Sequence, residues 1–160
     1  MKNKGGIEMS VVQKLEHLIL TIPSCLEENA EEEALQKTNQ ESWSKQEILG
    51  HLCDSATNNH MRFVKIKLAS DPVRIEKYQQ NQWVALHGYS TNYTYREMIM
   101  LWTLLNRQLL YVLKNGSAED LAKPVILDDE ITITLGWLIE DYVNHLLHHM
   151  KQIIVKSLTE

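Results

Sequence analysis

The segment VNHLLHHMKQI, residues 143–153, places three histidines within an apolar stretch that has the period of an α-helix. At about 100° per residue, His145 and His149 fall on one stripe, and Tyr142 and Gln152 lie within about 40° of its centre. The apolar residues of the segment centre about 120° away, so the helix has an apolar face and, beside it, a polar one. This pattern predicts a helix that packs on a core and turns two imidazoles toward one point.

Three further segments show the helical recurrence of apolar residues, and two of them begin with a capping box. Ser44 is followed three residues later by Glu47, and Thr94 is followed in the same way by Glu97. The first helix should weaken near Pro23, because proline lacks the N–H that a helix interior uses. The four predicted helices span residues 9–23, 44–70, 94–116 and 134–158.

Two connections between the predicted helices are long. The connection at residues 73–93 exceeds what a compact domain usually needs, and such segments commonly cover a functional site. The β-branched residues of VIL, 125–127, and ITITL, 131–135, flank Asp128-Asp129-Glu130 and predict a small hairpin. We therefore predict an all-α fold, a four-helix bundle with long crossover connections and a short β excursion before the last helix.

The length and composition are those of one globular domain. Of the 160 residues, 44% are hydrophobic and 23% charged. We expect residues 9–160 to form this domain and residues 1–8 to be a loose N-terminal tail. The chain lacks a run of about 20 apolar residues and an apolar leader, so we expect no membrane contact and a cytoplasmic protein. A net charge of −5 with scattered lysines and arginines argues against nucleic acid as a partner.

A third histidine that could join the pair is His51, which lies in the apolar run ILGHL early in the second helix. Cys53 points away from it around the helix, and the two cysteines lack the spacing of a thiolate metal site. Taken alone, His51 is more often a packed core residue than a ligand, and spacing leaves both interpretations open. His87, in the long connection, is placed where it could overhang a pocket. The other polar residues on the stripe of His51 are Asp54, Ser55, Asn58 and Arg62.

The segments WSKQEILGHL, residues 43–52, and HLLHHMKQI, residues 145–153, resemble the DinB/YfiT-like superfamily of four-helix-bundle proteins. The resemblance extends from about residue 9 across nearly the whole chain. It implies that His51, His145 and His149 bind a divalent metal ion, and that the protein is a homodimer. In some branches it also implies metal-dependent transfer of a low-molecular-weight thiol, which would then be a co-substrate.

Three neutral imidazoles would leave a divalent metal with an open coordination position for a water or a thiol, whose pKa would fall. All-nitrogen ligation suits zinc, nickel, copper or iron, and we expect zinc or nickel. Possible supporting or pocket residues are Asp54, Asn58, Trp83, Tyr142 and Gln152.

These features predict a metal-dependent enzyme, a thiol S-transferase or hydrolase, that acts on a small molecule. One alternative is a metal-binding stress or interaction module without catalysis. Another is a structural bundle in which the histidines are merely packed. The sequence does not assign roles to His148 and His87, nor does it name the metal or the substrate.

Overall fold

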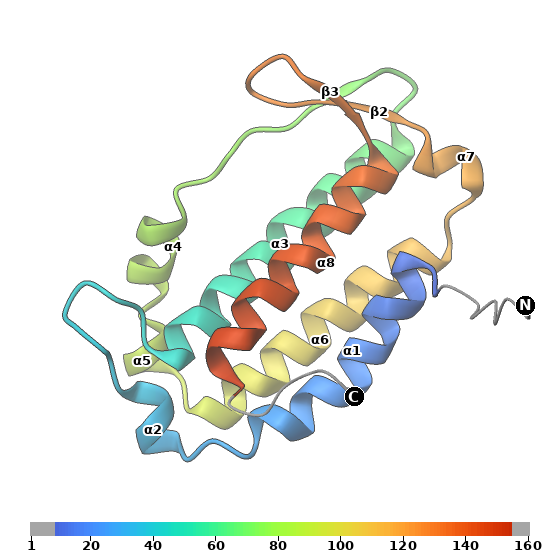
Figure 1. The fold of residues 1–160 in the computed structure, drawn as a ribbon. Coiled ribbons are helices and arrows are strands. Elements are labelled where there is room, and N and C mark those ends of the chain that lie inside the picture. Colours follow the sequence, from blue (N-terminus) through green and yellow to red (C-terminus); the bar gives the residue numbers. More distant parts are fainter. Residues whose placement is uncertain (1–8, 155–160) are drawn as a thin grey trace, which may run out of the picture.

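The computed structural model describes residues 9–154 and shows the predicted four-helix bundle (Figure 1). The expectation for residues 1–8, and the last six residues of the expected domain, lie outside the described residues. The small sheet and the short helices are confined to the connections. The four long helices are α1 (Val11–Leu26), α3 (Lys45–Leu68), α6 (Tyr95–Lys114) and α8 (Leu135–Ile153).

Side-chain caps fix where the long helices begin. The two predicted capping boxes are both present: the Ser44 and Thr94 hydroxyls accept from the N–H groups of Glu47 and Glu97, and each glutamate accepts from the cap N–H in return. Each box satisfies two backbone donors that the first turn of a helix leaves free. The starts of α3 and α6 are therefore properties of the local sequence.

The order of the long helices in space differs from their order along the chain. α3 packs against α6 and α8, and α1 packs against the same two helices, which places α1 and α3 on opposite corners of the bundle. The links from α1 to α3 and from α6 to α8 therefore cross from one corner to the opposite one. This arrangement confirms the predicted crossovers and sets α3 beside α8.

Apolar side chains of all four long helices fill the interior. Trp102 of α6 and Phe63 of α3 are completely buried at its centre. The expected weakening of the first helix near Pro23 is wrong: α1 continues to Leu26 with Pro23 inside it. The proline carbonyl still accepts a hydrogen bond from the N–H of Glu27, and the buried Leu26 anchors the last turn.

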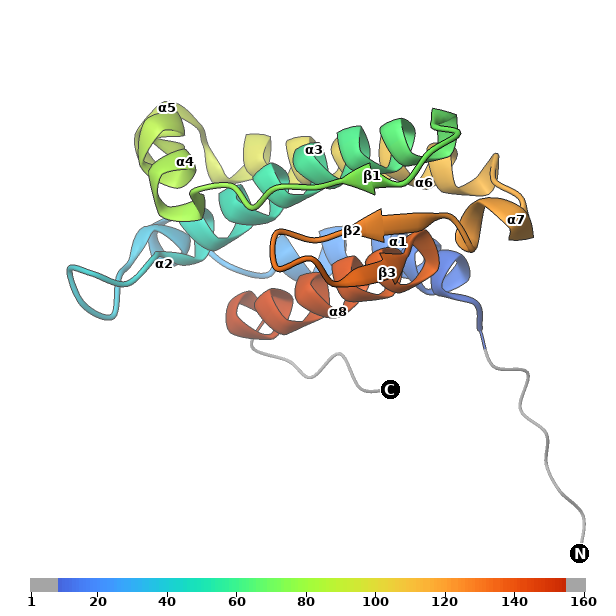
Figure 2. The same cartoon turned by 90° about the horizontal axis from the view of Figure 1, so that it is seen from above.

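The connections contain more regular structure than the sequence indicated. The predicted hairpin is present as β2 (Pro124–Ile126) and β3 (Thr132–Thr134), which pair antiparallel. The strand β1 (Val73–Arg74) from the long connection joins it as a third strand and pairs with β2 in parallel. Figure 2 shows this small sheet on one side of the bundle. The elements of the connections are α2 (Glu31–Leu35), β1 (Val73–Arg74), α4 (Gln80–His87), α5 (Tyr89–Asn92), α7 (Ala118–Leu121), β2 (Pro124–Ile126) and β3 (Thr132–Thr134).

The connection from β1 to α5 runs back along α3 toward the start of that helix (Figure 1). At one end Arg62 donates a hydrogen bond to the carbonyl of Glu76. At the other end Tyr89 lies against Gly50, where an added Cβ would come within 2.1 Å of the tyrosine ring. Gln46 of α3 donates to the carbonyl of Tyr89 over 2.7 Å and so holds the end of the connection in place.

In the described part of the chain, no helix is long and apolar enough to cross a membrane.

Candidate metal centre

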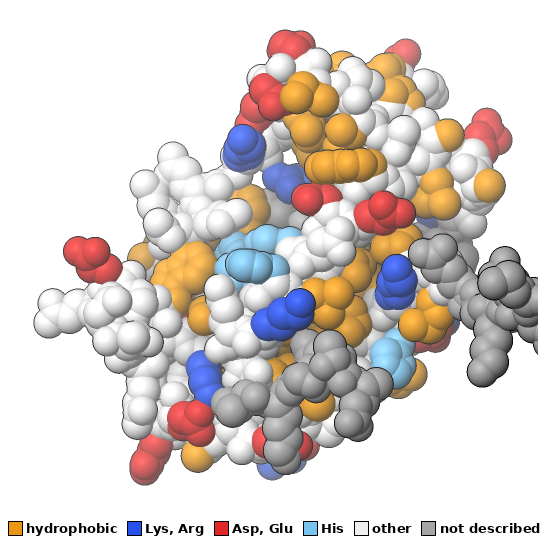
Figure 3. Space-filling model, viewed as in Figure 1, with side chains coloured by type: hydrophobic (Ala, Val, Ile, Leu, Met, Phe, Trp, Pro, Cys, Tyr) orange, Lys and Arg blue, Asp and Glu red, His pale blue; other side chains and the backbone are white. Residues whose placement is uncertain are grey.

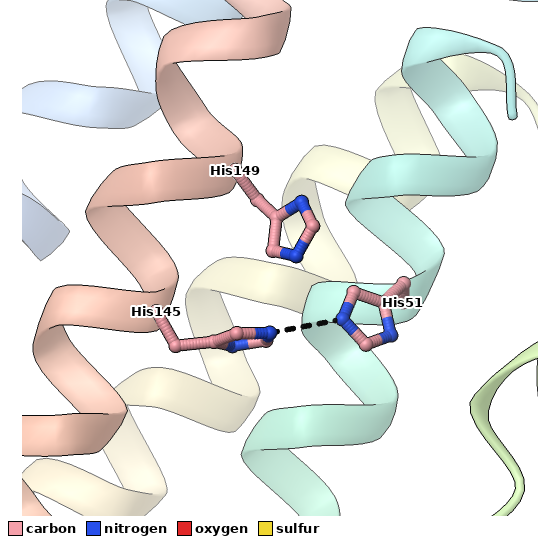
Figure 4. A group of neighbouring side chains, drawn as sticks. All are labelled: His51, His145 and His149. Atoms are coloured by element: carbon pink, nitrogen blue, oxygen red, sulfur yellow. Dashed lines mark hydrogen bonds between the residues drawn. The ribbon is translucent and has the colours of Figure 1, made fainter.

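The adjacent helices α3 and α8 bring three histidines together. His51 comes from the second turn of α3 and is completely buried, while His145 and His149 lie one turn apart on α8 and are half-buried. One ring nitrogen of each lies within 4.8 Å of the other two. Figure 4 shows these nitrogens facing a common space between the helices.

The spacing of the three rings fits a metal ion. The Nε2 atoms of His51 and His145 are 3.2 Å apart. Two nitrogens bound to one tetrahedral zinc at about 2.0–2.1 Å would be about 3.3 Å apart. The rings of His51 and His149 also meet nearly edge to face, with centroids 4.8 Å apart. The donor set is therefore three imidazoles.

The environment favours the neutral imidazoles that metal binding requires. Burial, followed by the charges of His145 and His149, lowers the pKa of His51 from 6.5 to about 3. Burial, followed by the charges of His149 and His148, lowers the pKa of His145 to about 4. Both rings therefore keep an unprotonated nitrogen at neutral pH, which is the form that binds a metal ion.

Gln152, named above as a possible supporting residue, contacts one of the three rings. Its Oε1 lies 2.9 Å from Nδ1 of His149. An amide oxygen can only accept a hydrogen bond, so Nδ1 carries the proton and Nε2 of His149 has a free lone pair. This arrangement is typical of metal-binding histidines.

Trp43 belongs to the site and was not among the residues that we predicted there. Its ring packs on His51 with centroids 4.9 Å apart. The signal was available, because Trp43 is the first residue of the segment that carries the family resemblance, directly before the cap of α3. Trp43 restricts the orientation of His51 by contact, since His51 Nδ1 is buried and has no hydrogen-bond partner among the described residues.

A cavity of about 660 Å³ adjoins His149. Gln152, Trp43 and Ile48 also line it. The cations Lys37 and Lys45 also line it, although each forms an ion pair with a glutamate. The cavity is large enough for a small molecule beside the metal centre.

Asp54 lies one turn beyond His51 on α3, but its contacts lead to the long connection. It is 2% exposed, and its Oδ1 accepts a hydrogen bond from Tyr89 over 2.5 Å. The ring nitrogen Nδ1 of His87 is 3.5 Å from the same oxygen and 2.9 Å from the carbonyl of Trp83. Burial raises the pKa of Asp54, an effect that Tyr89 and His87 oppose. Asp54 therefore anchors the connection beside the histidines.

Two other predicted residues make contacts that do not include the three histidines. The Tyr142 hydroxyl donates to Oδ1 of Asn106 over 2.6 Å, and its ring packs on Phe63 in the core. Asn58 donates to the carbonyl of Asp54 on its own helix.

Trp83 lies in α4 and packs between Tyr78 and His87, with ring centroids 5.2 and 5.9 Å away. Trp83 therefore packs within the connection that lies along α3. His148 is exposed and packs edge to face on His149, with centroids 5.1 Å apart. Cys53 is buried with a free thiol whose pKa is raised by burial, consistent with its exclusion as a ligand.

Comparison with known proteins identifies the family. A sequence profile for the DinB superfamily matches residues 22–153, which include all three histidines. A protein of Halalkalibacterium halodurans named as a putative metal-dependent hydrolase is 29% identical over 146 residues, or 87% of this chain and 84% of its own. A protein of Oceanobacillus iheyensis with the same kind of name is 24% identical over 111 residues, 69% of this chain and 63% of its own.

Solved structures agree on the fold. YfiT from Bacillus subtilis, described as a probable metal-dependent hydrolase with an unusual four-helix bundle topology, superposes with a TM-score of 0.75 at 21% identity, over 96% of this chain and 89% of its own. A mycothiol-dependent maleylpyruvate isomerase superposes with a TM-score of 0.67 at 11% identity, over 94% of this chain and 65% of its own. Profile, relatives and fold together show that the chain belongs to the DinB superfamily.

Proposed function

We propose that the protein is a divalent-metal-dependent enzyme that acts on a small molecule, with His51, His145 and His149 as the metal ligands. The observation that carries this proposal is the convergence of three imidazole nitrogens within 4.8 Å beside a cavity of about 660 Å³. Three protein ligands leave a coordination position open, as catalytic zinc sites do, whereas structural zinc sites are closed by four.

A divalent metal bound there would supply Lewis acidity and would lower the pKa of a water or a thiol in the open position. The residues of the chain have separate tasks. The Gln152 oxygen fixes the tautomer of His149, and Trp43 packs against His51 and excludes water from that side. The cavity beside His149 would hold the substrate.

The reaction class that we favour is hydrolysis. Both curated relatives are named as metal-dependent hydrolases, and YfiT is described in the same terms. Thiol transfer is the second candidate, supported by the shared fold of an isomerase whose name includes dependence on mycothiol. An open position on a three-histidine metal is suited to either nucleophile.

The metal content of tag-free protein tests the proposal directly. We expect about one divalent ion per chain, with zinc or nickel predominant, and its loss in the variants His51→Gln and His145→Gln. The matched control is His148→Gln, because His148 is an exposed histidine on the same helix and is not part of the cluster. Equal metal content in all four proteins would refute the three-histidine site.

Turnover separates an enzyme from a metal-binding module. The metal-loaded protein and its chelator-treated form should be compared on a panel of ester and amide substrates, and on thiols paired with an electrophile. Activity that needs the metal and is lost in His145→Gln supports the enzyme, and its preferred substrates choose between hydrolysis and thiol transfer. Bound metal without turnover on the panel would support the alternative, a metal-binding module that does no chemistry.

A further inference from the structure

A second cavity, of about 540 Å³, lies where the connection between β1 and α4 passes over α3. It is lined by Arg62 of α3 and by residues 77–82 of the connection. All seven lining residues are polar, two of them are cations, and none carries a carboxylate. Two cations without a lining carboxylate give the wall a positive charge, so its composition favours an anion.

Arg62 is a half-buried cation that has no ion-pair partner among residues 9–154. None of the ion pairs in the described part of the chain includes it, and the one hydrogen bond that its guanidinium makes there goes to the carbonyl of Glu76. Burial is the main influence on the pKa of Arg62 and lowers it, with Tyr78 and then Asp128 opposing the effect. An arginine side chain stays charged in proteins, so the remaining N–H donors of its planar fork are free to bind an oxyanion.

Tyr78 lines the same cavity and carries an unused donor. Its hydroxyl is buried and has no hydrogen-bond partner among the described residues, while its ring is held against Trp83 with centroids 5.2 Å apart. Burial, followed by the charge of Asp54, raises the pKa of Tyr78 to about 12, so the hydroxyl keeps its proton at neutral pH. A buried O–H without a partner costs free energy that a bound oxygen would recover.

The position of Arg62 relates this cavity to the metal centre. Arg62 follows His51 by eleven residues, which places it on the same face of α3, three turns and about 16 Å along the helix. Two hydrogen bonds hold the connection to α3: Arg62 donates to the carbonyl of Glu76, and the Tyr89 hydroxyl donates to Asp54. Residues 77–82 lie between these two contacts. Figure 3 shows this face, with cationic, acidic and histidine side chains around the hollow beside the α4 segment.

We propose that Arg62 and the Tyr78 hydroxyl form a binding site for an oxyanion, a carboxylate or a phosphate, carried by a small-molecule ligand. Arg62 would bind two oxygens through its fork, and Tyr78 would donate one further hydrogen bond. The site exists independently of the metal. The further step, that this ligand is the substrate, rests on the proposed function. The substrate would then be an elongated anion whose charged end lies about 16 Å from the group that reacts.

The test is calorimetric titration of the metal-free, full-length protein with inorganic phosphate and, in a separate arm, with succinate. We expect saturable binding of at least one probe, with a Kd on the order of 1 mM. Arg62→Gln should weaken binding at least about tenfold, and Tyr78→Phe by a smaller factor. The matched control is Arg74→Gln, because Arg74 is a nearby arginine whose fork already binds Glu130 at 2.7 and 2.9 Å.

Binding of phosphate alone would identify a phosphate ligand, and binding of succinate alone a carboxylate. Failure of both probes, or binding that Arg62→Gln leaves unchanged, would overturn the proposal. If Arg62→Gln does not fold, Arg62→Lys keeps the charge but loses the fork, and unchanged affinity in that variant would equally refute the site. The His51→Gln variant should bind the probe normally, so failure of the metal site and failure of this site give different results.

Discussion

The Nδ1 atom of His149 lies 2.9 Å from the Oε1 atom of Gln152, three residues later on α8. This hydrogen bond turns the other nitrogen of His149 toward His51 and His145. The glutamine therefore acts on the metal centre without being a ligand, and its contribution can be measured separately from theirs.

Gln152→Ala should weaken metal binding by about 10-fold or more, because groups that orient a metal-binding histidine typically contribute 10–100-fold to affinity. The measurement is a competitive titration against a chelator of known affinity. Gln152→Glu retains an accepting oxygen and should restore most of the affinity, whereas Lys151→Ala should have no effect. An unchanged affinity in Gln152→Ala would show that His149 is oriented by its packing alone.

Gly50→Ala should destabilise the protein by about 1–3 kcal/mol, because the new Cβ meets the buried Tyr89 ring. The separation from Cδ2 of that ring would be 2.1 Å, which is too short for any real contact. The measurement is urea unfolding. In a Tyr89→Ala background the same change should cost nothing and should gain up to about 1 kcal/mol, since alanine favours a helix over glycine. Equal costs in both backgrounds would contradict the close approach.

Tyr89→Phe should lower the free energy of unfolding by about 1–3 kcal/mol, because it leaves the Asp54 carboxyl buried without its hydroxyl partner. The hydroxyl donates to Oδ1 of Asp54 over 2.5 Å, and the carboxyl is 2% exposed. Tyr111→Phe is the control, since the Tyr111 side chain is 53% exposed. If the two variants are equally stable, the bond between Tyr89 and Asp54 contributes nothing to the fold.

The metal-free protein should lose stability as the pH falls from about 6.5 to about 5, since unfolding lets two histidines take up protons. The pKa values of His51 and His145 are about 3 and about 4 in the folded protein and 6.5 as the ordinary value, so the unfolded chain binds more protons throughout this window. The free energy of unfolding should fall by up to about 1.4 kcal/mol per pH unit for each histidine.

The raised pKa of Asp54 acts in the opposite direction, because the folded protein then holds that proton more tightly than the unfolded chain. Variants that keep Asp54 share this contribution, so the effect of the histidines is obtained from the difference between such variants. The double variant His51→Gln with His145→Gln should show a much flatter pH dependence in the same urea experiments. A slope equal to that of the unaltered protein would mean that other groups titrate on unfolding.

The sequence by itself determined the features that depend on neighbours along the chain. The capping boxes at Ser44 and Thr94 set where two helices begin, because a cap uses hydrogen bonds that span three residues. The stripe that His145, His149 and Gln152 share follows from the period of one helix, and the bond between His149 and Gln152 confirms it. The hairpin before α8 was equally local.

Only the tertiary structure decided what long-range packing controls. Spacing could not tell whether His51 is a core residue or part of a cluster, because His145 is 94 residues away and their meeting depends on how α3 packs on α8. The period of α8 placed Tyr142 on the polar face with the histidines. In the structure its buried hydroxyl instead donates a hydrogen bond to Asn106 in the core, because a buried hydroxyl needs a partner. The same holds for β1, a strand of two residues that exists because β2 offers it backbone partners.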